Sequence, residues 1–192
     1  MNREEALNFL DKKVKNKNIF KHMLATEALM SDLYEFLKDR GDGDLGIKED
    51  WAMAGLLHDG DYSDQVPEEK QGVEISRWLK EEGISVPQEV AQAMVSHNAK
   101  TGVKPQSKMD WTIFCGDSLT GLIVACTLVQ PDKKLASLKT NSILKKFKNK
   151  SFARGTRRED IILCEKKLDI PLKDFVEVAL RAMQKISSSL EL

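Results

Sequence analysis

The stretch "WTIFCGDSLTGLIVACTLV", residues 111 to 129, decides the fold class of this chain. Its 19 residues are near the minimum length of a membrane-spanning helix. However, Asp117 lies near its centre, and a carboxylate at the middle of a bilayer costs roughly 2.5 to 3.5 kcal/mol on insertion scales. No second candidate span accompanies it. The stretch therefore predicts the buried central helix of a soluble protein.

The sequence on both sides of this stretch is helical in pattern. Apolar residues recur at helical spacing, and glycine-rich or proline-containing segments such as "RGDGDLG" separate the periodic runs. Helices are expected at 3–14, 18–39, 48–57, 67–82, 87–97, 109–129, 132–150 (with a break near Thr140), 156–168 and 171–190. No segment has the pattern of a strand. The sequence predicts an all-α, single-domain helical bundle over residues 1–192, with a core at about 18–130 and a helical extension at about 131–192.

Composition narrows the class of protein. Apolar residues make up 41% of the chain and charged residues 31%, as in ordinary globular proteins. The net charge is zero, so the overall field does not favour a membrane or a nucleic acid as partner. The N-terminus has no apolar signal segment, and the three cysteines form no CxxC pair. We expect a cytoplasmic protein with reduced cysteines.

Ionisable side chains stand at unusual places in this apolar framework. His22 lies inside the second helix, His58 and Asp59 end the third in "LLHDGDY", and Asp117 lies in the most apolar helix. Each has an ordinary interpretation: a satisfied core histidine, an exposed helix-end acid, or a buried acid held by a hydroxyl or an arginine. Together, two imidazoles and two carboxylates from three helices form a mixed nitrogen and oxygen set that suits Mn, Fe, Co, Ni or Zn.

The order of these residues resembles the HD superfamily of metal-dependent phosphohydrolases. The segments "WAMAGLLHDGDY", "AMVSHNAK", "DSLTGLIVA" and "KKFKNKSFARGTRRED" are similar to a branch of small, stand-alone HD hydrolases, over roughly residues 20 to 190. The resemblance implies a helical bundle of the HD type with a buried metal site. It implies that one divalent metal ion (Mn, Fe, Co, Ni, Zn or Mg) is held by His22, His58, Asp59 and Asp117.

Further catalytic roles are less firmly indicated. Asp59 would take part in catalysis as a metal ligand. His97 would hydrogen-bond the substrate phosphate or donate a proton to the leaving group, unless it is a surface histidine at a helix end. Asp61 would orient the metal-bound water or act as general acid or base, unless it is a loop acid or a helix cap. Since His97 is the only additional histidine and Gln71 occupies the stretch after the HD loop, we expect one metal.

A basic segment offers a way to bind phosphate. Residues 133 to 158 contain ten lysines and arginines and no acid. Lys145, Lys146 and Arg154 are the candidate substrate-binding residues, although a solvated helical face would have the same composition. No aromatic stacking platform accompanies them, which argues against nucleic acid as the partner.

The sequence thus predicts hydrolysis of a phosphomonoester of a small metabolite, a nucleotide being the first candidate, by a metal-activated water. Two alternatives remain: a phosphodiesterase acting on a cyclic or oligonucleotide substrate, and a non-catalytic sensor that binds a nucleotide. The expected partner is a small phosphorylated substrate, with no membrane. The sequence leaves open whether the protein is a homo-oligomer.

Overall fold

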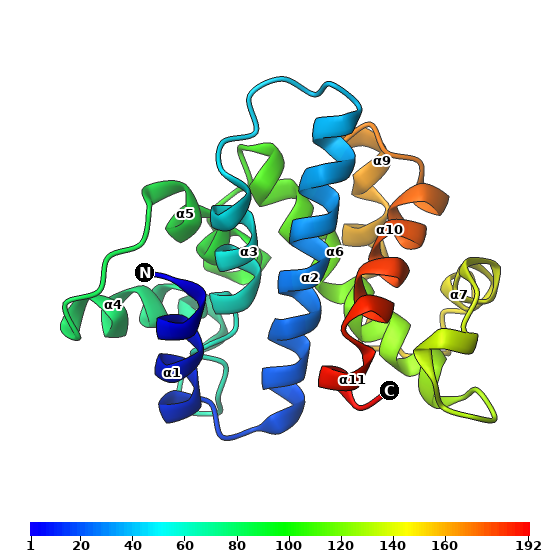
Figure 1. Cartoon of the computed structure of the whole chain (residues 1–192), viewed down its shortest axis with the longest axis horizontal. Coiled ribbons are helices and arrows are strands. Elements are labelled where there is room, and N and C mark those ends of the chain that lie inside the picture. The colour runs from blue at the N-terminus through cyan, green and yellow to red at the C-terminus, as the bar shows by residue number, and fades with distance from the viewer.

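Helices account for all regular secondary structure in the computed structural model, which describes the whole chain (Figure 1). The all-α prediction is therefore confirmed. The α-helices are α1 (Arg3–Lys13), α2 (Lys17–Asp39), α3 (Lys48–Leu57), α4 (Val73–Glu81), α5 (Gln88–Ser96), α6 (Lys108–Leu128), α7 (Thr140–Phe147), α8 (Arg158–Ile161), α9 (Leu163–Lys167), α10 (Leu172–Lys185) and α11 (Ser187–Leu190). Short 3-10 turns lie at Glu68–Lys70, Ala99–Thr101 and Leu135–Ser137.

The expected helix at 67–82 is interrupted. A 3-10 turn ends at Lys70, and α4 begins only after Gly72, whose φ is +81°. This left-handed conformation favours glycine, and a Cβ here would collide with the backbone carbonyl of Met94 on α5. Gly72 therefore ends the first turn and lets α4 start close to α5.

The C-terminal helices are shorter than their periodicity predicts. The segment expected at 132–150 is helical only from Thr140, and the last two expected helices divide at Ile162 and Ile186. Ile186 has φ −111° and ψ 19°, outside the helical range, while apolar spacing continues through it. Hydrophobic periodicity cannot reveal such single-residue breaks, because the same face is buried on both sides of the break.

Helix α2 is the central element of the bundle. It packs against α3 on one side and against α6 and α10 on the other (Figure 1). Buried apolar side chains form one continuous cluster from Ala6 to Leu190, and Ile143 and Phe175 of the C-terminal extension belong to it. The extension thus packs onto the same core as the N-terminal helices.

Helix α6 is the only helix long and apolar enough to cross a membrane by length and composition. Within the protein, 67% of its most apolar window is buried, as expected for the core helix of a soluble protein. Asp117 is among its buried residues, and so are Cys115 and Cys126. All three cysteines of the chain are buried and free.

Candidate metal centre

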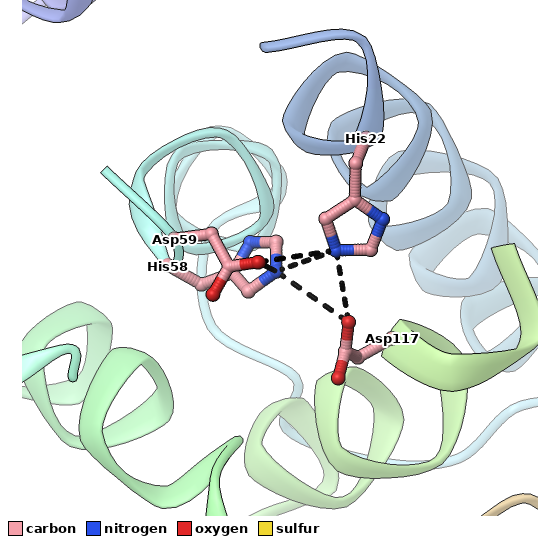
Figure 2. A group of neighbouring side chains, drawn as sticks. All are labelled: His22, His58, Asp59 and Asp117. Carbon is pink, nitrogen blue, oxygen red and sulfur yellow. Dashed lines mark hydrogen bonds and ion pairs between the residues drawn. The ribbon is translucent and has the colours of Figure 1, made fainter. Parts of the chain in front are cut away.

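Four ionisable side chains from three helices point toward one another (Figure 2). His22 comes from α2, His58 and Asp59 from the end of α3, and Asp117 from α6. Their candidate ligand atoms all lie within 4.8 Å of one another. The structure thus brings together the four residues that the sequence singled out as metal ligands.

The spacing of the donor atoms fits a single metal ion. His22 Nε2 lies 2.9 Å from Asp117 Oδ1, 3.4 Å from Asp59 Oδ2 and 3.2 Å from His58 Nε2. His58 Nε2 lies 3.5 Å from Asp59 Oδ2 and 3.7 Å from Asp117 Oδ1. Ligands bound at about 2.0–2.2 Å around one tetrahedral ion lie roughly 3.3–3.6 Å apart, and cis ligands of an octahedral ion lie closer. Most of the separations fall in or near this range.

Hydrogen bonds on the far side of each imidazole fix which nitrogen faces the cluster. His58 Nδ1 lies 2.8 Å from the carbonyl oxygen of Gly55, which can only accept. His22 Nδ1 lies 2.9 Å from the hydroxyl of Thr120, and that hydroxyl donates to the carbonyl of Asp117. Both Nδ1 atoms therefore carry the hydrogen when the rings are neutral, and both Nε2 lone pairs face inward. Metal-binding histidines have this arrangement.

The charges of the cluster favour a cation. Burial raises the pKa of Asp59 and of Asp117, but the neighbouring histidines outweigh burial and hold both values well below the ordinary range. Burial likewise disfavours a charged His22, yet its hydrogen bonds with Asp117 and Asp59 raise its pKa to about 10. Two ionised carboxylates thus attract positive charge to this place, and a proton on His22 Nε2 supplies it in the metal-free protein. A divalent metal would replace that proton and bind the freed Nε2 lone pair.

A close contact between helices positions two of the ligands. Gly55 lies on α3 three residues before His58, and a Cβ at this position would lie 2.7 Å from the carbonyl oxygen of Thr26 on α2. Only a residue without a side chain lets the two helices pack at this distance. The chain needs glycine here to bring His58 beside His22.

His97 lies at the edge of this group. It caps α5, its Nδ1 lies 2.5 Å from the carbonyl oxygen of Met94, and its Nε2 lies 3.3 Å from Asp59 Oδ1. The residue is buried rather than on the surface. Burial lowers the pKa of His97, but its hydrogen bond with Asp59 outweighs this and raises the pKa. His97 thus faces the second oxygen of a carboxylate whose first oxygen faces His22 and His58.

Asp61 has a different environment from Asp59. Its carboxylate accepts hydrogen bonds from the backbone N–H of Gly72, at 2.9 and 3.0 Å, and from that of Ile75 at 2.9 Å. These groups lie at the start of α4, where the helix has unpaired N–H donors. Asp61 does not line the cavity beside the metal ligands. The structure therefore places Asp61 as a helix cap, the second of the two interpretations that its sequence position allowed.

A cavity of about 420 Å³ opens beside the ligand group. Three of the ligands, His22, Asp59 and Asp117, line it, and His97 is part of its wall. The segment between α7 and α8 also lines it and contributes Ala153, Arg154, Gly155, Thr156 and Arg157. Arg154 has no hydrogen-bond or ion-pair partner within the protein, so its guanidinium is free to meet an anion. Lys145 and Lys146, the other candidate substrate-binding residues, do not line this cavity.

Arg157 is a site residue that the sequence did not single out. Its Nη2 lies 2.6 Å from Asp117 Oδ2, and its Nε lies 2.7 Å from Asp160 Oδ2. Asp117 therefore presents one oxygen to the histidines and the other to Arg157. Forty residues separate the two partners, and no spacing rule connects them in the sequence.

One arginine holds the segment 148–157, called the arginine loop below, in place. The guanidinium of Arg158 donates to five backbone carbonyls, at distances of 2.6 to 3.4 Å: those of Phe147, Asn149, Phe152, Ala153 and Thr156. In addition, Lys146 Nζ lies 4.7 Å from the ring centre of Phe152. Ala153 has φ +46°, which is unusual for a residue with a side chain. The conformation that presents Arg154 and Arg157 to the cavity thus depends on the side chain of Arg158.

Comparison of the chain with protein-family models, with curated proteins and with solved structures gave no match. The function proposed for this chain therefore rests on the geometry of the site and on the motif resemblance.

Proposed function

We propose that this protein is a metal-dependent phosphohydrolase of the HD type. It would hydrolyse a phosphomonoester of a small metabolite, and the motif resemblance makes a nucleotide the first candidate. The observation that carries the proposal is the convergence of His22, His58, Asp59 and Asp117, with both Nε2 atoms directed inward, beside a cavity that contains a free arginine.

These four residues would hold one divalent ion. When bound, such an ion lowers the pKa of a water molecule toward neutrality and polarises a phosphoryl oxygen. The protein itself fixes the ligands: Thr120 and the carbonyl of Gly55 orient the two imidazoles, and Arg157 holds the carboxylate of Asp117. Preorganised ligands of this kind need little rearrangement when the substrate binds.

The arginine loop would bind the phosphate. Arg154 offers an unpaired planar guanidinium, which suits the oxygens of a phosphoryl group. His97 Nε2 is the candidate group for moving a proton to the leaving oxygen, because it lies in the cavity wall next to Asp59. Asp61 is given no chemical role, since backbone N–H groups occupy both of its oxygens.

The first test of this proposal is the metal content of the purified protein. Wild type, Asp59→Ala and Asp64→Ala would be purified without an affinity tag and measured by elemental mass spectrometry. Asp64 is the matched control, because it is an exposed acid of the same loop. We expect roughly one equivalent of a divalent metal in wild type and in Asp64→Ala, and loss of that metal in Asp59→Ala. Equal trace amounts in all three proteins, unchanged by added manganese, would contradict a metal centre.

The second test is hydrolysis by the metal-loaded protein. Hydrolysis of p-nitrophenyl phosphate in preference to bis-p-nitrophenyl phosphate would support a monoesterase, and the reverse preference would support the phosphodiesterase alternative. A panel of nucleotides would then test the substrate class. Bound metal with no turnover of any ester would contradict an enzymatic function and favour the sensor alternative.

A further inference from the structure

A second cavity, of about 480 Å³, lies on the other side of His22. It is enclosed by α2, α6 and the C-terminal residues 190–192. Two residues, His22 and Gly121, line both this cavity and the first one. The two cavities therefore adjoin at His22 and Gly121, beside the place where the phosphate would bind.

The two cavities differ in the chemistry of their walls. Most residues that line the first cavity are polar, and Ile19, Tyr62 and Ala153 are its apolar lining residues. In the second, two helix faces oppose each other, each with residues about one turn apart: Asn18, Lys21 and Ala25 on α2, and Gly121, Val124 and Leu128 on α6. Leu190 and Leu192 add further apolar surface. The second cavity therefore offers an apolar group the larger apolar surface.

The second cavity also lacks a free cation for another phosphate. Lys21 is the only lysine or arginine in its wall, and its Nζ lies 2.6 Å from Glu191 Oε2. The charge of Lys21 is therefore offset within the protein. A pyrophosphate or an oligonucleotide would place a second anion here without a partner.

Gly121 is not required by packing. A Cβ at this position would meet no atom within 4 Å, unlike Gly116 on the same helix, where it would meet Leu29. Gly121 has ordinary helical conformation, and glycine destabilises the middle of a helix relative to alanine. The absence of a side chain at Gly121 leaves open space beside both cavities.

We infer that the second cavity receives the alcohol part of the phosphoester, and that Gly121 determines which alcohols enter. The ligand class is a phosphomonoester with an apolar aromatic or aliphatic group next to the phosphate. The inference rests on the proposed function for the location of the phosphate. It deepens that function by selecting an apolar phosphomonoester within the proposed class. It selects against sugar phosphates, polyphosphates and oligonucleotides, and also against the nucleotide that the motif resemblance favours, because a nucleotide has a polar ribose next to its phosphate.

Binding can be measured separately from hydrolysis. Isothermal titration calorimetry on the metal-loaded protein would compare 1-naphthyl phosphate with glycerol 1-phosphate, which carry the same phosphate group. Burial of part of the naphthyl ring predicts roughly tenfold or tighter binding of the aromatic ester. The leucine side chain of Gly121→Leu would fill the open space beside residue 121 and remove this preference. Gly121→Ala is the matched control: it raises the melting temperature by roughly 2–4 °C and keeps most of the preference.

The outcomes separate this inference from the proposed function. If the aromatic ester binds more tightly, the preference disappears in Gly121→Leu, and neither ester is hydrolysed, then the inference holds and the enzymatic proposal fails. Equal affinity for the two esters in wild type would overturn the inference even if both are hydrolysed. No binding of either ester would also overturn it, as would an unchanged preference in Gly121→Leu. Dimerisation through this face, detected by sedimentation and abolished by Val124→Glu, would overturn it by filling the cavity with a second copy of the chain.

Discussion

The candidate metal-ligand group and the arginine loop line the same cavity, yet they are built in opposite ways. The ligands lie within regular helices or at their ends, and buried apolar residues hold those helices in place. The arginine loop contains no regular structure between α7 and α8, and its carbonyls are gathered by the single side chain of Arg158. The first region thus depends on the whole core, and the second depends on one residue.

The two regions are therefore sensitive to different substitutions. A ligand on a helix moves only when its helix moves, so substitutions at the contacts between helices are the most damaging to the metal site. The arginine loop can lose its shape while the bundle remains folded, because few buried apolar contacts hold it. Substitutions in each region, and in a second loop, test this difference.

Gly55→Val is expected to have the largest effect, because the new side chain would collide with the backbone of α2 at Thr26 and Glu27. Overpacking of this kind lowers the free energy of unfolding by about 3 kcal/mol. Both the midpoint of urea unfolding and the bound metal should decrease. Gly116→Ala is the control: its new Cβ meets the end of the Leu29 side chain, which can shift, so the metal should be retained. Full metal content in Gly55→Val would show that the two helices can separate without loss of the site.

Arg158→Met removes the donors to the five loop carbonyls. We expect a loss of about 2 kcal/mol in the free energy of unfolding, because several partly buried carbonyls lose a charged donor. If the proposed function holds, KM should rise roughly tenfold while most of the metal is retained. Release of Arg157 frees one oxygen of Asp117, but the four candidate ligands stay on their helices. Arg181→Met on α10 is the control, since Arg181 is exposed. Loss of metal in Arg158→Met would mean that the loop and the ligand group are not independent.

Asp61→Ala tests whether Asp61 has a different role from Asp59, two residues away. The substitution leaves the N–H groups of Gly72 and Ile75 without their acceptor, and we expect a loss of about 1.5 kcal/mol. Thermal unfolding would measure this loss, and elemental analysis should find the same metal content as in wild type. Should activity disappear in a folded, metal-loaded Asp61→Ala protein, the assignment of Asp61 as a helix cap alone would be wrong.

Asp42→Asn tests a second irregular segment, the loop between α2 and α3. Hydrogen bonds from Arg40 and Lys108 lower the pKa of Asp42 to about 2, from an ordinary value of 3.8. A depressed carboxyl pKa stabilises the fold above the unfolded value, and this stabilisation is lost as the pH falls from about 4 toward 2. We expect Asp42→Asn to lower the free energy of unfolding by about 1 kcal/mol at pH 7. The value is small because the loop is partly solvated. The difference from wild type should narrow below pH 4, and a constant difference would contradict the ionic contribution.

Much of this fold could be predicted because its signals are local. The periodicity of residues 3–57 and 109–129, together with Asn2 as helix cap, gave helices whose ends the structure places within one or two residues. The C-terminal helices were predicted too long, since burial of the same face continues across the breaks at Ile162 and Ile186. Periodicity reports which face is buried and not whether the backbone turns.

Residue type alone could predict only which side chains were candidates for the metal site. With three histidines in the chain and one acid inside the apolar stretch 111–129, few metal-binding groups were possible, and the ordered motif resemblance selected one. Arg157 and Arg158 could not be distinguished from the other cations of residues 133–158. Because the backbone between α7 and α8 is irregular, Arg157 reaches Asp117 and Arg158 is surrounded by loop carbonyls. No periodic sequence pattern predicts such a backbone.

The hydrogen bonds of the histidines also bear on the order in which the site assembles. His58 and His97 each bond a carbonyl three residues earlier, within their own helix end, so both rings can be oriented as soon as α3 and α5 form. The partner of His22 is Thr120, 98 residues along the chain, and it comes into reach only when α6 docks against α2. Contacts of such long separation form late in folding, after local helices. His22 is therefore the ligand whose orientation reports that the bundle has closed.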